Sequence, residues 1–249
     1  MSKTIISLCG RKRTGKESAY KTILQYVDHP EEFQFATPLK KFCIEVLGLT
    51  HDQCYGSDQD RESLTKYAWK DVDEAIRIKY GKDPNSMMTA RDVLQVVGTD
   101  LMRKGLYMNV WAEGGIREAT RSSAKTCIFT DTRFPNEVKV TRLAPTLDNT
   151  FDRPLLIRLY RDTGLNDGHE SETALDCWDL VPNQRRVGPE YTDQLSKAGY
   201  SRINDTLWRG SENTPYDFLV DNNSTLASLR KNMLYILKEW EIYREPSCS

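Results

Sequence analysis

Short apolar runs recur along the chain and are separated by longer stretches of mixed polarity. The first run, Thr4–Cys9, is almost continuously apolar and ends at a glycine, which is typical of a strand buried on both faces of a parallel sheet. Similar runs predict strands at Phe33–Ala36, Thr126–Thr130, Leu155–Tyr160 and Phe218–Val220. Strands that alternate with helices predict an α/β fold, with a doubly wound, parallel, five-stranded sheet and helices on both faces.

The stretches between and after these runs have the spacing of helices. Thr89–Met102 predicts one helix, because its first residue can cap it and Asp92 follows three residues later, close to a capping box. The last helix is expected over about Leu226–Tyr243, where apolar residues recur on one face. Residues 162–215 are polar and rich in Gly, Pro, Asn and Asp, which indicates an insertion or a mobile lid. We expect a single domain over residues 1–249 that contains this insertion.

Composition limits the classes of function. The 249 residues carry a formal net charge of −1, so there is no broad basic field and we expect no nucleic-acid partner. The six cysteines form no Cys-x-x-Cys pair and only three histidines are present, which does not favour a structural zinc site. The first residues do not follow a signal-peptide pattern, and no apolar run is long enough to cross a membrane. We therefore expect a reducing, cytoplasmic location and no membrane partner.

The segment CGRKRTGKES, which begins at the end of the first apolar run, is close to a phosphate-binding loop. Gly10, Gly15 and Lys16 fit the pattern of Gly, four residues and Gly-Lys-Ser/Thr. Glu17 stands where the hydroxyl residue is usual, and the hydroxyl comes one place later at Ser18. The order of strand, glycine loop and helix is the context that such a loop requires.

The same segment has the chemistry of an anion site. Gly10 and Gly15 allow backbone shapes in which successive N–H groups surround a phosphate, and the following helix directs its positive end at the same anion. Lys16 can reach the outer phosphates as a point charge. The other basic residues of the loop are Arg11, Lys12 and Arg13. This local cluster favours a small anionic ligand over a long polyanion.

A second candidate lies in the segment FTDTRFPNE. Asp131 follows the apolar run Cys127–Phe129, and a carboxylate at the carboxyl end of a buried strand lies over the ligand crevice of a doubly wound sheet. There it can hold magnesium directly or through water, and Arg133 can face a phosphate. The alternative is structural: Asp131 caps a turn and Arg133 pairs with Glu137.

A polar stripe is expected on the predicted helix Thr89–Met102. Its members, at positions i, i+4, i+7 and i+8, are Arg91, Gln95, Gly98 and Thr99. Residues at this spacing share a helix face, so an Arg and an amide could hold a phosphate and a base edge. A glycine inside a helix costs about 1 kcal/mol relative to alanine, which close approach of a ligand or helix–helix packing would equally justify. The alternative for the whole stripe is a solvated face.

Together these segments resemble the deoxynucleoside monophosphate kinases of large tailed bacteriophages. The family's loop has an acidic residue after Gly-Lys and then Ser or Thr, as in GRKRTGKES, a variant that phosphomevalonate kinases share. Further segments resemble the family in the same order: FATPLKK, DRESLT, RDVLQVVGTDL, NVW, TDTRFPNE, HESE in the expected lid, and VDNNSTL, which resembles the family's adenine-side loop. The chain departs from the family where Asn223 and Ser224 replace Asp-Gly, and it is longer over about residues 180–215.

The resemblance implies a P-loop kinase that transfers the ATP γ-phosphoryl group to a deoxynucleoside monophosphate (dNMP), with Mg²⁺ as cofactor. The ATP-binding residues that it implies are Gly10, Arg11, Arg13, Thr14, Gly15, Lys16, Glu17, Ser18 and Asn222. The implied dNMP-binding residues are Lys40, Arg61, Arg91, Gln95, Gly98, Thr99, Trp111, Asp131, Thr132, Arg133 and Glu137. The implied catalytic residues are Lys16, Asp131, Arg133 and Arg161, and the candidate magnesium ligands are Ser18 and Asp131, with water a third.

Several expectations attach to this resemblance. Residues of about 40–115 would form an acceptor-binding helical region, and Arg161, at the root of the lid, would close over the transferred group. Trp111 would pack on the sugar or base, or else belong to the core. ATP and dNMP are the expected partners, a homodimer is left open, and the location is the host cytoplasm if a phage encodes the chain.

Two other functions compete with this hypothesis. A kinase of another small phosphorylated metabolite, of the phosphomevalonate or dephospho-coenzyme-A type, would share the loop and the sheet, although the segments DRESLT and RDVLQVVGTD argue against it. A non-catalytic nucleotide-binding module would tolerate the loss of Arg133 and the lid arginines, which are present here.

Overall fold

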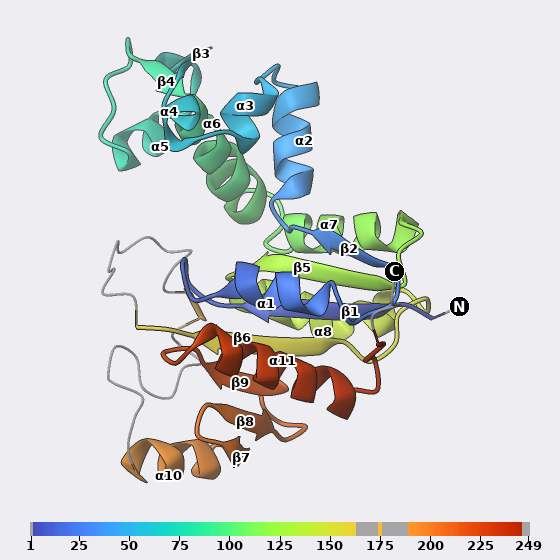
Figure 1. The fold of residues 1–249 in the computed structure, drawn as a ribbon. Helices are drawn as coiled ribbons and strands as arrows, with labels where there is room; N and C mark the ends of the chain where they lie inside the picture. Colours follow the sequence, from blue (N-terminus) through green and yellow to red (C-terminus); the bar gives the residue numbers. More distant parts are fainter. Residues whose placement is uncertain (1, 163–173, 176–188, 246–249) are drawn as a thin grey trace. The chain divides into compact units, whose positions relative to one another are not determined.

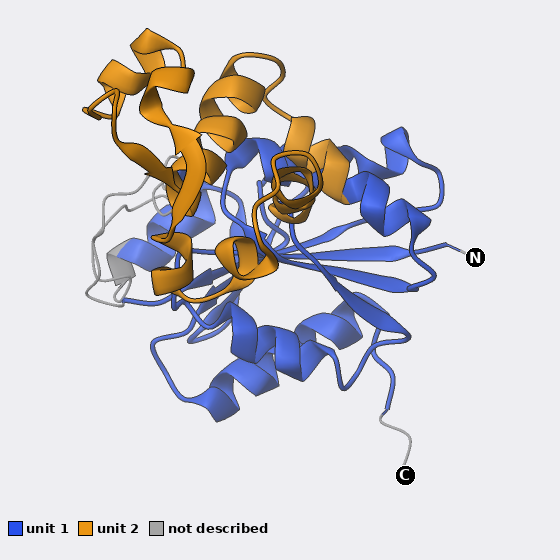
Figure 2. Cartoon of the chain, turned by 90° about the horizontal axis from the view of Figure 1, so that it is seen from above, with its two compact units in different colours: residues 1–35, 116–249 blue, residues 36–115 orange. Residues whose placement is uncertain are grey.

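The computed structural model of the chain describes residues 2–162, 174–175 and 189–245. The chain divides into two compact units (Figure 2): unit 1 comprises Met1–Phe35 and Ile116–Ser249, and unit 2 comprises Ala36–Gly115. Each unit has a hydrophobic cluster of its own. Within the described ranges, no helix has both the length and the apolar character that a membrane crossing demands.

Unit 1 is built on a seven-stranded sheet with the order β2-β5-β1-β6-β9-β8-β7 (Figure 1). The strands are β1 (Thr4–Cys9), β2 (Pro30–Phe33), β5 (Thr126–Thr132), β6 (Leu155–Tyr160), β7 (Tyr200–Asn204), β8 (Leu207–Gly210) and β9 (Phe218–Asp221). In this order, adjacent strands from β2 to β9 pair in parallel. The strand β8 pairs antiparallel with both β9 and β7. The expected α/β fold with a mostly parallel sheet is confirmed. The expected number of five strands is wrong, because two antiparallel strands extend the parallel five.

The strand β2 differs in position from the prediction. It begins at Pro30 and ends at Phe33, where the predicted strand began. Glu31 and Glu32 are exposed because β2 is an outer strand of the sheet. Apolar runs alone therefore do not identify most of β2, since a strand at an edge does not have to be buried on both faces.

The strands β7 and β8 lie in the stretch that was expected to be an insertion or lid. Tyr200 and Trp208, one in each strand, are nevertheless buried, and they pack with Leu195 in the same hydrophobic cluster. This part of the stretch thus belongs to the sheet and its core. Residues 163–173 and 176–188 of the same stretch lie outside the described residues.

Helices cover both faces of the sheet in unit 1. They are α1 (Lys16–Ile23), α8 (Pro135–Leu147), α10 (Pro189–Lys197) and α11 (Leu226–Glu239), and α7 (Val110–Arg121) crosses from unit 2 into unit 1. Successive strand residues point to opposite faces, so Ile157 of β6 belongs to the cluster with α1 and α11, whereas Leu156 belongs to the cluster with α8 and α10. Burial on both faces explains why β6 is almost continuously apolar.

A single carboxylate connects β9, β6 and α8. Asp217 accepts hydrogen bonds from Nη1 of Arg142 at 3.0 and 2.9 Å and from the backbone N–H of Leu156 at 2.7 Å. We expect Asp217→Ala to lower the free energy of unfolding by about 3 kcal/mol, because it leaves a charge and an N–H group without their acceptor. Urea unfolding measures the loss. As a control, Asp205→Ala removes the exposed partner of Arg202 and should cost less than about 1 kcal/mol; equal losses would contradict the prediction.

Unit 2 is mainly helical and contains one two-stranded antiparallel sheet, β3-β4. Its elements are α2 (Thr37–Glu45), α3 (His51–Tyr55), α4 (Asp58–Arg61), β3 (Leu64–Ala68), η1 (Trp69–Asp71), α5 (Glu74–Lys79), β4 (Met87–Thr89), α6 (Ala90–Gln95) and η2 (Val96–Lys104). Buried Cys43, Trp69 and Trp111 belong to its core.

Two helices differ from the sequence-based expectation. The capping box at the start of α6 is confirmed, with Asp92 N–H donating to Thr89 Oγ1 at 3.1 Å and Thr89 N–H donating to Asp92 Oδ2 at 3.0 Å. However, α6 ends at Gln95, and the chain continues in the wider π-helical form as η2, so the 3.6-residue period assumed for the polar stripe does not hold there. The last helix, α11, ends at Glu239 rather than near Tyr243, since Glu241 has a φ of 62°.

Candidate functional site

The glycine loop joins the carboxyl end of β1 to α1, as the sequence predicts. Gly15 is the N-cap of α1 and has a φ of 99°, a left-handed conformation that favours glycine. At Gly10 a Cβ atom would lie 2.7 Å from the carbonyl oxygen of Leu159, so a larger residue would not fit. Arg13, which also has a positive φ of 62°, is exposed. The loop thus depends on glycine at both ends.

Hydrogen bonds close the loop on itself. Lys16 Nζ donates to the carbonyl oxygens of Gly10 at 2.6 Å and Arg11 at 2.7 Å. The hydroxyl of Thr14 donates to the same Arg11 carbonyl at 2.9 Å. The ammonium group of Lys16 is therefore held across the loop, next to backbone N–H groups at the start of a helix, which is a favourable arrangement for an anion.

The two residues after Lys16 differ in position. Glu17 is exposed and forms an ion pair with Lys21 at 2.6 Å on the outside of α1, and the hydrogen bond from Lys21 lowers the pKa of Glu17. Ser18 is half-buried in the first turn of α1, and its carbonyl accepts from Thr22. Of the two, Ser18 is the one that offers a hydroxyl near the loop.

The end of β5 lies beside the start of the loop. The N–H of Gly10 donates to the Thr132 carbonyl at 3.4 Å, and the buried hydroxyls of Thr132 and Ser7 are 2.6 Å apart. Asp131, in the same strand, accepts at Oδ1 from the backbone N–H of Phe35 at 2.8 Å. This bond fixes the carboxylate at the carboxyl end of the parallel strands, where ligands bind in doubly wound sheets.

Glu137 has a structural role in the helix that follows β5. It is 3% exposed, and its Oε2 accepts from the backbone N–H groups of Arg133 at 2.8 Å and Phe134 at 3.0 Å. The carboxylate thus caps the start of α8. Glu137 and Arg133 are thus joined through the backbone N–H of Arg133, and the phosphate-facing role of the Arg133 side chain stays a prediction.

Three more residues lie at the carboxyl ends of the parallel strands. Asn222, which follows β9, donates from Nδ2 to the Thr14 carbonyl at 3.0 Å. Arg161 follows β6 directly and is exposed. Cys9, the last residue of β1, is fully buried, and burial raises the pKa of its thiol to about 12, so it stays neutral beside the loop.

In unit 2, two of the predicted phosphate-binding cations come from helices that both contact α3. Lys40 Nζ is 4.2 Å from the centroid of the Tyr55 ring. Lys40 lies in α2 and Arg61 in α4, and both helices contact α3, which contains Cys54. Burial raises the pKa of Cys54, whereas the charges of Lys40 and Arg61 lower it. The sequence segments FATPLKK and DRESLT thus both contribute to helices that pack against α3.

Arg91 reaches the same region from α6. Its Nη2 donates to Asp58 at 3.1 Å and its Nε donates to Glu62. These carboxylates flank Arg61 in sequence, and the Glu62 bond raises the pKa of Arg91. Of the five guanidinium N–H groups, three are not used by these two bonds. The bonds bring Arg91 to the segment that contains Arg61, and the convergence of both arginines on one phosphate stays a prediction. Neither carboxylate was singled out from the sequence.

The remaining residues of the predicted stripe, and Trp111 after them in sequence, have packing roles or are half-buried. A Cβ atom at Gly98 would lie 2.7 Å from Cδ2 of Leu39, so packing of η2 against α2 accounts for this glycine. Trp111 is buried, and its Nε1 donates to the Gly98 carbonyl at 3.0 Å, as expected for a core residue. Gln95 and Thr99 are half-buried.

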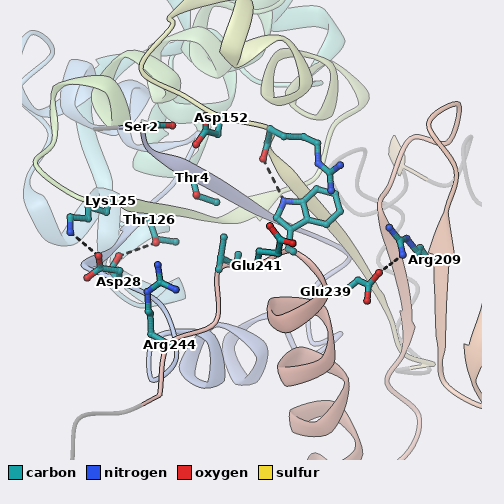
Figure 3. Close-up of a pocket in the computed structure, with 13 residues that line it drawn as sticks. Ser2, Thr4, Asp28, Lys125, Thr126, Asp152, Arg209, Glu239, Glu241 and Arg244 are labelled. Carbon is teal, nitrogen blue, oxygen red and sulfur yellow. Dashed lines mark hydrogen bonds and ion pairs between the residues drawn. The ribbon is translucent and has the colours of Figure 1, made fainter.

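Unit 1 also contains a cavity of about 720 Å³ (Figure 3). It lies at the amino end of β1, whereas the glycine loop follows the carboxyl end of that strand. It is lined at the amino ends of β1 and β5 and by the chain after α11. Its charged residues include the ion pairs Lys125–Asp28 at 2.7 Å and Arg209–Glu239. No sequence motif pointed to this cavity.

Among the described residues, no group of three or more His, Cys, Asp and Glu side chains could hold a metal ion.

Comparison with known proteins adds a distant relative. No protein-family model matches the chain. The chain is 27% identical over 205 residues to a protein of Acanthamoeba polyphaga mimivirus named "Putative deoxynucleotide monophosphate kinase". The match covers 77% of this chain and 93% of the viral protein, so the similarity is not confined to the glycine loop.

Proposed function

We propose that the protein is a deoxynucleoside monophosphate kinase, which transfers the γ-phosphoryl group of ATP to a dNMP and releases ADP and the deoxynucleoside diphosphate. The observation that carries the proposal is the loop between β1 and α1, with glycine at both ends and Lys16 held across it. The name of the distant viral relative supports the same activity.

The reaction needs little covalent chemistry from the protein. An oxygen of the acceptor phosphate forms a bond to the γ-phosphorus while the bond from that phosphorus to the β–γ bridging oxygen breaks. Catalysis depends on alignment and on neutralisation of charge. The loop N–H groups and Lys16 would hold the donor phosphates, and Arg133 and Arg161 would offset charge on the transferred group.

The acceptor phosphate would be bound by the cations of unit 2. Lys40, Arg61 and Arg91 come from three segments. The bonds from Arg91 to Asp58 and Glu62, which flank Arg61 in sequence, support a shared role for the two arginines. Arginine suits this role because its planar guanidinium can bond two phosphate oxygens at once.

Magnesium is expected with ATP. Ser18 and Asp131 offer the hard oxygen atoms that Mg²⁺ prefers, so their chemistry fits the ion, and both are candidates to hold it. When bound, Mg²⁺ neutralises charge on the β- and γ-phosphate oxygens.

A coupled assay tests the proposal. Purified protein is given ATP, Mg²⁺ and a panel of deoxynucleoside and ribonucleoside monophosphates, together with phosphomevalonate and dephospho-coenzyme A. We expect release of ADP with one or more deoxynucleoside monophosphates. Turnover of only another phosphorylated metabolite would support a kinase of a different class, and no turnover despite ATP binding would support a non-catalytic nucleotide-binding module.

A further inference from the structure

The backbone of Asn222 is fixed by the sheet of unit 1. Asn222 follows β9, and its N–H donates to the Tyr160 carbonyl at 2.7 Å, which extends the parallel pairing of β6 and β9 by one residue. The residue is 7% exposed. Its side chain therefore leaves a rigid point in the core, and this favours a single orientation of the amide.

This amide contacts the glycine loop from outside. Nδ2 of Asn222 donates to the carbonyl of Thr14, a residue 208 positions earlier that is 2% exposed. A Cβ atom at Gly15 would lie 2.1 Å from the same Nδ2. The amide thus occupies the space in which a side chain at position 15 would have to lie, and Gly15 is required by its neighbour as well as by its φ of 99°.

The bond determines the direction of one peptide group. In a planar trans peptide the C=O and the next N–H point in opposite directions. Because the Thr14 carbonyl points at Asn222, the N–H of Gly15 points away from Asn222. No hydrogen bond from this N–H occurs within the described part of the chain. It lies at the positive end of α1, where an N–H group can serve an anion.

We propose that Asn222 is a positioning residue for the donor phosphates. It turns the Thr14–Gly15 peptide so that the Gly15 N–H faces a phosphate of the bound triphosphate, and it does so without contacting the base. The resemblance to phage kinases put Asn222 on the adenine side; its burial and its bond to Thr14 favour an action through the loop. The inference rests on the proposed function, because it takes a nucleoside triphosphate as the ligand of the loop.

The test separates phosphate binding from base binding. Calorimetry measures the affinity of the full-length protein for ATP and for inorganic triphosphate, each with Mg²⁺. The variants are Asn222→Ala, which removes the amide, and Asn222→Asp, which keeps the shape but cannot donate to Thr14. Asn232→Ala is the matched control, since Asn232 is also a buried amide of unit 1 but bonds Asn204 and Thr206. Thermal unfolding shows that each variant is folded.

Both Asn222 variants are expected to bind ATP and inorganic triphosphate about tenfold to a hundredfold more weakly, by the same factor for each, as for a lost hydrogen bond to a charged group. Asn222→Asp should lose the more, because its carboxylate repels the Thr14 carbonyl. Asn232→Ala should keep both affinities even if it lowers the melting temperature.

Three results would overturn the proposal. Weaker binding of ATP with unchanged binding of inorganic triphosphate would show that Asn222 contacts the base. Unchanged binding of both would show that the loop keeps its shape without Asn222, and would leave the proposed function intact. A wild-type protein that binds neither probe would remove the proposed function together with this inference.

Discussion

Replacement of Lys16 by alanine is expected to lower kcat by about a hundredfold to a thousandfold while the protein stays folded. A preorganised group that stabilises charge in the transition state contributes on this scale. Nζ of Lys16 contacts carbonyl oxygens of the loop, and the side chain is not part of a hydrophobic cluster, so its loss should leave the core unchanged. Steady-state kinetics with ATP and the best monophosphate measure the effect, and circular dichroism verifies the fold.

Lys21→Ala provides the control for this prediction. Lys21 lies on the same helix, is 67% exposed and pairs with Glu17 rather than with the loop. Its replacement should leave kcat within about twofold, since exposed ion pairs contribute little. Near-normal turnover by a folded Lys16→Ala protein would refute the assignment of this loop to the donor phosphates.

The second large effect is expected at the acceptor. Arg61→Ala and Arg91→Ala should each raise the KM for the monophosphate about tenfold to a hundredfold, because hydrogen bonds to charged groups contribute roughly 1.5–3 kcal/mol and about 1.4 kcal/mol is a factor of ten. Arg91→Ala should have the larger effect. It also leaves Asp58 and Glu62 without the guanidinium that they hold, and both carboxylates would then repel the phosphate.

The KM for ATP should stay within about twofold in both variants, and the loss should be similar for every accepted base, since the phosphate is common to them all. Arg77→Ala is the control, because Arg77 is an arginine of unit 2 that pairs with Glu74 on α5. A defect in the KM for ATP with an unchanged KM for the monophosphate would mean that the donor and acceptor residues have been assigned the wrong way round.

The parts of the fold that could be predicted from the sequence are the strands that lie inside the sheet. Burial on both faces of a sheet requires apolar residues along the strand, and such runs are visible in the sequence. β1, β6 and β9 are buried on both faces and are mostly apolar, and β5 contains the buried apolar run Cys127–Phe129, so the positions of these strands were predicted. β2 is an outer strand whose glutamates are exposed, and β7 and β8 combine exposed polar residues with a few buried ones such as Tyr200 and Trp208. Composition alone assigned these last two to an insertion.

In the candidate site, features that are local in sequence could be predicted, whereas contacts between distant residues could not. The glycine loop is local in sequence, so its residues and their order were enough to predict it. The bond between Asn222 and Thr14 joins residues 208 positions apart, and the pairing of Arg91 with Asp58 depends on how α4 and α6 pack. Contacts of this kind depend on the path of the chain. Gly98 likewise has a neighbour, Leu39, that no spacing within its own helix could identify.

The ends of the seven-stranded sheet restrict how copies of the chain can associate. β2 is one of the two outer strands. It is short, its Pro30 has no N–H group to donate to a further strand, and Glu31 and Glu32 are exposed. Proline and like charges on an outer strand oppose pairing with another strand. A second copy of the chain is therefore not expected to continue the sheet through β2, and a homodimer would have to form on a different surface of the protein.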